Sequence, residues 1–230
     1  MTAHPEMTSR PSEGDPDLAR MDDMVAASPG DSLHLADLPW RLSSPSARDP
    51  ERTRLWEDAD GRLVAWAVLQ FPWHCVDYQV DPSARSEALE GAVLGWAAER
   101  LNGEAAGIGE SLPFYASARK DDTRRSTAIR RTGFSPDEWS YVHMAREMDG
   151  PIPVPVLPEG FRIRPLAGET EIEAYVAMHR AAFGSANMTA EWRRSTLRHP
   201  RYVKGLNLVI VAPDGVLVGF CVCWITPPLP

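Results

Sequence analysis

The chain has 230 residues, 43% of them hydrophobic and 24% charged, which is typical of a globular protein with one large or two modest domains. Its net charge of −8 argues against wholesale binding to nucleic acid. The sequence has no run of 18 apolar residues and no basic-then-apolar leader, so we expect neither a membrane span nor a secretory signal, and a cytoplasmic protein.

The first third of the chain predicts a lead-in followed by strands. Residues 1–30 are polar, and we expect them to be partly disordered. Residues 55–69 read LWEDADGRLVAWAVL, in which Asp60-Gly61 between two apolar runs predicts a β-hairpin. WHCVDYQV, at 73–80, predicts a further strand of mixed pattern.

The middle of the chain predicts alternating helices and strands. Residues 86–101 carry apolar side chains at helical spacing. SLPFYASAR, at 111–119, then predicts a strand, 123–132 a short basic helix closed by Gly133, and EWSYVHMAREM, at 138–148, a final strand. The proline-rich stretch 148–161 favours extended chain and marks a boundary.

The last third of the chain repeats the start of this pattern. A strand at 161–165, a helix ending at Gly184 and a short helix at 188–199 precede VIVAPDGVLVGFCVC, at 209–223. This hairpin matches the one at 55–69, including its Asp-Gly turn. We therefore predict a duplicated domain whose second copy lacks the equivalent of about 80 residues. Coincidence of strand composition is the alternative.

The three cysteines indicate no disulfide framework, because their number is odd. Cys221 and Cys223 are two residues apart in an apolar run, so they share one face of a strand. A metal site would need two further ligands nearby. We expect these cysteines to behave as small buried apolar residues and expect no metal.

The order of elements resembles the GNAT superfamily of N-acetyltransferases, and the duplication resembles its tandem, mycothiol-synthase-like members. The resemblance covers about 30–230 and rests on the hairpins, the strand–turn–helix at 73–101 and RRTGF at 130–134. It implies an α/β (α+β) fold of three-layer αβα domains with a mixed central sheet, in two tandem copies. The expected parts are a lead-in (1–30), a degenerate GNAT-like domain (31–150), a linker (151–160) and an incomplete second domain (161–230), truncated after its hairpin.

The resemblance also implies that acetyl-CoA lies where two central strands splay apart. Its pyrophosphate would rest on backbone N–H groups of a loop of the form Arg/Gln-x-x-Gly-x-Gly/Ala, at a helix N-terminus that favours anions. An amine would attack the thioester, with a carboxylate, a histidine or water accepting the proton and a tyrosine protonating the thiolate. The matching cofactor-binding residues are Val80, Arg85, Ser86, Ala88, Leu89 and Arg125, the last for the 3′-phosphate, and the candidate catalytic residues are His74, Asp77 and Tyr115.

Two departures from the family pattern keep a second interpretation open. Glu90 takes the place of the loop's second glycine, where its carboxylate would repel a pyrophosphate, and Ile129 takes the usual place of the tyrosine. The candidate residues also have ordinary structural interpretations: a core role for Tyr115 and a solvated helix face for Arg125. The chain is therefore predicted to be an acetyl-CoA-dependent transferase acting on a primary amine, with a non-catalytic binding or assembly module, or a truncated pseudoenzyme, as the alternative. In both cases the apolar edge at 216–224 predicts self-association.

Overall fold

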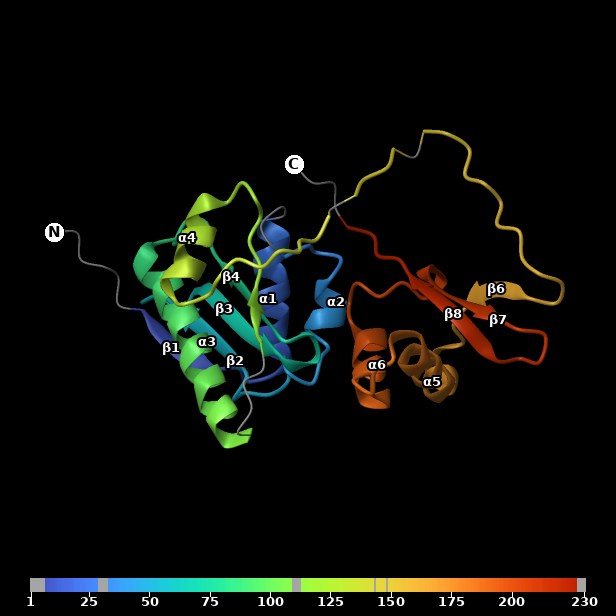
Figure 1. Ribbon diagram of the computed structural model, residues 1–230, viewed down its shortest axis with the longest axis horizontal. Helices are drawn as coiled ribbons and strands as arrows, with labels where there is room; N and C mark the ends of the chain where they lie inside the picture. Colours follow the sequence, from blue (N-terminus) through green and yellow to red (C-terminus); the bar gives the residue numbers. More distant parts are fainter. Residues whose placement is uncertain (1–6, 29–32, 109–112, 143, 148, 227–230) are drawn as a thin grey trace. The chain divides into compact units, whose positions relative to one another are not determined.

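The computed structural model describes residues 7–28, 33–108, 113–142, 144–147 and 149–226. The chain forms two compact units (Figure 1). The first comprises 1–134, 191–202 and 225–230, and the second comprises 135–190 and 203–224. These units differ from the predicted domains in that 135–150 group with the second unit and 191–202 with the first. Within the described residues, no helix combines the length and the apolar character needed to cross a membrane.

The first unit is built on a five-stranded mixed sheet with the strand order β1-β2-β3-β4-β5. Neighbouring strands are antiparallel except β4 and β5, which are parallel. The strands are β1 (Thr8–Pro11), β2 (Thr53–Glu57), β3 (Leu63–Gln70), β4 (Cys75–Val80) and β5 (Tyr115–Ala116), and the helices are α1 (Asp15–Ala27), α2 (Leu38–Arg41), α3 (Glu87–Ile108) and α4 (Thr123–Arg131). The predicted Asp60-Gly61 turn joins β2 to β3.

Helices cover both faces of this sheet, which gives three layers. All eight residues of β3 are buried, as expected for a strand packed on both faces. Ala65, Ala67 and Leu69 pack in one core with apolar residues of α3 and α4, whereas Trp66 and Val68 pack in a second core with α1 and α2. The αβα layering and the mixed sheet confirm the predicted fold class.

The structure corrects the expectation of a partly disordered lead-in, because β1 and α1 form within residues 8–27. Arg10 of β1 donates to Asp17 at the start of α1, with Nη1 2.6 Å from Oδ2, and to Glu57 of β2. Leu18, Met21 and Val25 follow helical spacing and are buried against the sheet. The sequence pattern is short and polar, and the structure forms because Arg10 also reaches Glu57, 47 residues away, and the apolar residues of α1 pack on β3.

The second unit contains a three-stranded antiparallel sheet with the order β6-β7-β8. Its strands are β6 (Arg162–Pro165), β7 (Asn207–Val211) and β8 (Leu217–Val222), and helix α5 (Ile172–Phe183) follows β6. The α5 residue Tyr175 packs on Phe220 of β8, with ring centroids 5.1 Å apart. The short helix α6 (Ala190–Arg198) is the predicted helix at 188–199.

The strand registers of the two units repeat at one constant spacing. Leu55 faces Trp66 across the first hairpin, and Val209 faces Phe220 across the second. Each partner in the second unit lies 154 positions after its counterpart. A register irregularity lies between Trp56 and Glu57 in the first hairpin, and its counterpart lies 154 positions later.

Backbone hydrogen bonds repeat at the same spacing. Ser12 N–H donates to the carbonyl of Thr53, and Leu166 N–H donates to that of Asn207. At the other end of the hairpins, Leu69 N–H donates to the carbonyl of Arg52, and the bond 154 positions later is also present. Even the capping ion pairs correspond, because Arg10–Asp17 is matched by Arg164–Glu171.

Two predicted strands differ in the structure. The strand expected at 111–119 is limited to the two residues of β5, and the described residues of 138–148 form no strand. In the latter segment Tyr141, Val142 and Met144 are at least 77% exposed. Apolar residues in a strand-like pattern form a strand only where a neighbouring strand or face receives them, and none does here.

Candidate functional site

The parallel strands β4 and β5 separate soon after they begin. Among the described residues, the pairs between these strands are Cys75 with Tyr115 and Val76 with Ala116, although β4 continues to Val80. Within that part of the chain, the later residues of β4 have no neighbouring strand on this side. The predicted splay between two central strands is present at the point from which the chain runs into α3.

The guanidinium of Arg125 lies in this splay. Its Nε donates to the carbonyl of Ser117, just beyond β5, at 2.9 Å, and its Nη2 donates to the carbonyl of Tyr78 in β4 at 3.0 Å. Its Cζ lies 3.5 Å from the centre of the Tyr78 ring, a cation–π contact. The residue is 1% exposed. The side chain predicted to reach a 3′-phosphate thus joins the two separating strands.

A serine caps the helix that follows β4. The hydroxyl of Ser86 accepts a hydrogen bond from the backbone N–H of Leu89 at 3.2 Å, which satisfies one of the unpaired N–H groups at the start of α3. Asp81 orders the preceding turn by accepting from both the backbone and the hydroxyl of Ser83. The turn is therefore held by its own side chains rather than by glycines.

Glu90 carries a buried carboxylate one turn into α3. It is 1% exposed, with Oε1 3.4 Å from Nε of Arg85 and Oε2 3.8 Å from Nε of Arg124. Arg85 also approaches Asp122, with Nη1 3.4 Å from Oδ2. Burial raises the pKa of Glu90 above its usual range, and the positive charges of Arg85, Arg124 and Arg125 oppose that shift.

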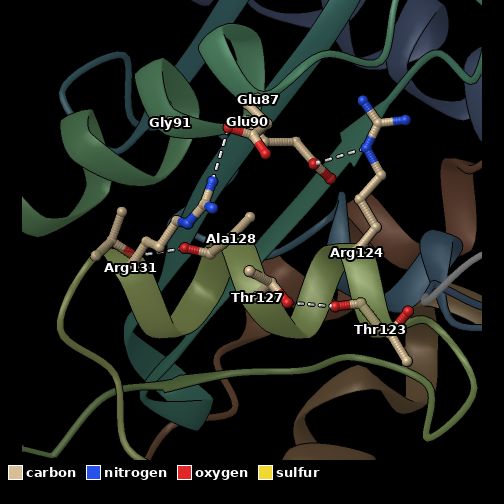
Figure 2. A pocket seen from close by; sticks show the side chains of 9 residues that line it. Glu87, Glu90, Gly91, Thr123, Arg124, Thr127, Ala128 and Arg131 are labelled. Carbon is tan, nitrogen blue, oxygen red and sulfur yellow. Dashed lines mark hydrogen bonds and ion pairs between the residues drawn. The ribbon is translucent and has the colours of Figure 1, made fainter.

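A pocket of about 240 Å³ opens between α3 and α4 beside this carboxylate. Figure 2 shows Arg124 and Arg131 of α4 on the side facing the glutamates of α3. Arg131 pairs with Glu87, with Nη1 2.7 Å from Oε2. The lining residues are Glu87, Glu90, Gly91, Thr123, Arg124, Thr127, Ala128, Arg131 and Thr132. The pocket is below the usual range for a drug-sized ligand, about 300–1,000 Å³.

No protein-family model matches the sequence, and no curated protein matches it. The structure is similar to that of a GCN5-related N-acetyltransferase from Sphaerobacter thermophilus, with 19% identity and a TM-score of 0.53, over 96% of this chain and 72% of that one. The chain has the GNAT fold. A yeast protein, the Saccharomyces cerevisiae N-myristoyltransferase with bound myristoyl-CoA, matches with 12% identity and a TM-score of 0.49, over 94% of this chain and 56% of that one. At 19% identity the likeness to the Sphaerobacter protein concerns the fold alone and leaves the reaction open.

Asp77 lies on the opposite face of β4 from the α3–α4 pocket. Its neighbours in β4, Val76 and Tyr78, pack in the core with α3, whereas both Asp77 oxygens accept from Nη1 of Arg41 in α2, at 2.8 and 2.9 Å. Burial raises the pKa of Asp77, and Arg41 counters that shift. Arg41 was not predicted as a site residue, because it lies 36 positions from Asp77 with no local signal.

His74 and Tyr115 lie next to each other at the start of the splay. The Tyr115 N–H donates to the carbonyl of His74 at 2.8 Å, and the His74 ring stacks on Phe114 with centroids 5.9 Å apart. His74 has a left-handed backbone, with φ of 49°. The fold thus brings the backbones of His74 and Tyr115 together, while Asp77, within β4, is engaged by Arg41.

Trp192 and the two C-terminal cysteines differ in burial. Trp192 of α6 is buried, and its Nε1 donates to the carbonyl of Trp40 at 3.1 Å. Cys221 and Cys223, expected to be buried, are exposed, with their Sγ atoms 3.7 Å apart. Cys221 lies in β8, which is an edge strand of its sheet, and Cys223 follows the end of that strand. Among the described residues, no three His, Cys, Asp or Glu side chains gather to form a metal site.

Proposed function

We propose that this chain is an acyl-CoA-dependent N-acyltransferase, which transfers an acetyl group from acetyl-CoA to a primary amine of a small molecule or peptide in the cytoplasm. The observation that carries the proposal is the separation of β4 and β5 beside the capped start of α3. This opening lies in a fold shared with an N-acetyltransferase over 96% of the chain. We further propose that the two units arose by duplication, as in the tandem GNAT proteins.

The residues proposed to contact acetyl-CoA surround the start of α3. Backbone N–H groups of 86–88 lie at the positive end of the helix, where an anion is stabilised, and that of Leu89 would have to leave the Ser86 hydroxyl to join them. Arg85 and Arg124 lie nearby and carry the positive charge a phosphate needs. Val80 ends β4 at the edge of the splay, and Arg125 occupies the splay itself. In the present arrangement these charges are committed to protein groups, so the fit to a pyrophosphate is poor.

The groups proposed to move protons lie at the start of the splay. His74 and Tyr115 are adjacent, and both are only partly buried. Asp77 is the weaker candidate for a base, because two short contacts with Arg41 stabilise its ionised form and hold its oxygens. An incoming amine reaching His74 would thus lose its proton to imidazole, and the tyrosine would serve as the proton donor.

The test of the proposed function is a transfer assay on the full chain. Acetyl-CoA and a panel of primary amines, including polyamines, amino sugars and peptides with free N-termini, are incubated with the protein, and release of the coenzyme A thiol is measured. We expect amine-dependent release that His74→Ala reduces at least tenfold. Release no faster than in the absence of protein, for every amine, contradicts the proposal.

A non-catalytic assembly module is the second candidate function. The observation that favours it is the pair of buried charges, Glu90 and Arg125, at the two places where acetyl-CoA would lie. Such a module would show no transfer with any amine and would retain its fold without ligand. A transfer rate above background excludes it.

A further inference from the structure

In the first unit, charged side chains lie at both positions where the proposed function places an acyl-CoA. These positions are the start of α3 and the splay between β4 and β5. The carboxylate of Glu90 lies beside the start of α3, where the phosphates would bind, and it is one of the residues that line the pocket. The guanidinium of Arg125 lies between β4 and β5 and uses the carbonyl of Tyr78. Both side chains are 1% exposed, so the chain itself fills positions that solvent would otherwise occupy.

We infer that Glu90 is an internal substitute for the phosphate of a nucleotide-type ligand, and that it determines whether the first unit accepts an anion between α3 and α4. This inference rests on the proposed function and names a residue that controls ligand choice at the same site. Glu90 occupies the pocket through a carboxylate, which has the charge sign and the acceptor oxygens of a phosphate.

The arginines around Glu90 support this assignment. Arg85 and Arg124 approach the two carboxylate oxygens from different elements, the turn before α3 and the start of α4. Both Nε···O distances are 3.4 Å or longer, and Oε1 makes no hydrogen bond with any described residue. The glutamate therefore holds the arginines by charge, without the short bonds of a well-formed pair. A phosphate would compete with Glu90 for these arginines, and also with Asp122 for Arg85 and with the carbonyl of Arg85 for Arg124.

The position of Glu90 also explains why the carboxylate is unfavourable to a bound phosphate. Two negative charges 4 Å apart repel each other, and the repulsion increases where water is excluded, as beside this buried side chain. A phosphate reaching Arg85 and Arg124 must therefore displace Glu90 or share the site with it. Glu87 differs, because its side chain is 76% exposed and pairs with Arg131 at the open side of the pocket.

The experiment compares coenzyme A binding to the full chain, by isothermal titration at constant salt, in three variants. Glu90→Gln keeps the shape of the side chain, and Glu90→Ala gives the small residue that suits a close backbone approach. Glu87→Gln is the matched control, because it removes one charge from the same pocket at its exposed side. We expect both Glu90 variants to bind at least about tenfold more tightly than wild type, and Glu87→Gln to change affinity less than about threefold.

A second variant set shows where the gain originates. Adding Arg85→Gln to Glu90→Ala should return the affinity to about that of wild type, since the released arginine is then absent. Melting curves on all variants verify that each is folded. Equal affinity in wild type and both folded Glu90 variants overturns the inference, as does an equal gain in Glu87→Gln.

The proposed function is decided separately. Wild type that binds coenzyme A tightly, with no gain in the Glu90 variants, overturns the inference and leaves the transferase proposal supported. A transfer rate measured below saturation with acetyl-CoA that is equal in wild type and Glu90→Ala also overturns the inference and supports the transferase proposal. A gain in coenzyme A binding with no transfer by any variant supports the inference and contradicts the transferase proposal.

Discussion

The contribution of Arg125 to joining β4 and β5 can be measured as a change in the free energy of unfolding. Replacing it by methionine preserves the length of the side chain and removes two hydrogen bonds, to the carbonyls of Tyr78 and Ser117. Hydrogen bonds to a charged group contribute about 1.5–3 kcal/mol each, so the loss is about 3–6 kcal/mol. Removing a buried charge recovers part of this cost. We therefore expect Arg125→Met to lower the free energy of unfolding by about 2–4 kcal/mol.

The measurement is urea unfolding of the full chain, followed by far-ultraviolet circular dichroism. Arg125→Lys is the conservative variant: it keeps the charge but lacks the planar fork that reaches two carbonyls, so it should recover only part of the loss. Arg131→Met is the control, because Arg131 lies on the same helix, is 61% exposed and pairs with exposed Glu87. A change below about 1 kcal/mol is expected there. Arg125→Met within about 1 kcal/mol of wild type would refute the bridging role.

Three further predictions address other parts of the chain. Arg10 lowers the pKa of Asp17 to about 2, so Asp17 stabilises the fold above its ordinary pKa of 3.8 and loses that effect as the pH falls toward 2. Asp17→Asn should then cost about 2 kcal/mol at pH 7, and a cost that persists unchanged at pH 3 contradicts this reasoning. Two thiols, Cys221 and Cys223, should react rapidly with a thiol reagent, while Cys75, whose pKa burial raises to about 12, should react only after unfolding. Val218→Glu should reduce self-association of wild type in light scattering at about 100 μM, and a monomeric wild type rules out an associating edge.

The sequence was sufficient for the elements whose signals are local. Asp60-Gly61 and Asp214-Gly215 turns are defined by the residues at the turn itself, and both hairpins form where expected. The capped start of α3 likewise needs only Ser86 and the helical spacing behind it. By contrast, β1 depends on Arg10 finding carboxylates in α1 and β2, which no local pattern encodes.

The candidate site follows the same division. The acidic residue at position 90 of the proposed phosphate loop is visible in the sequence itself, although its burial is not. The position of the Arg125 side chain was not predictable. A basic helix has the same sequence pattern whether a given arginine faces solvent or donates to a buried carbonyl. The choice is made by the splay, and the splay exists only once β5 has ended after two residues. The role of Arg41 beside Asp77 is equally non-local.

The repeated hydrogen bonds indicate how a further strand would pair with the open edge of β8. In the first unit β3 has neighbours on both sides, β2 and β4, and all its residues are buried. Its counterpart β8 shares the same register and the same end bonds but lies at the edge of its sheet, and Val218 is 50% exposed. An apolar strand with one open edge is a template for a further strand. Because β4 pairs antiparallel with β3, the strand that completes β8 should also be antiparallel, whether a second copy or another chain supplies it.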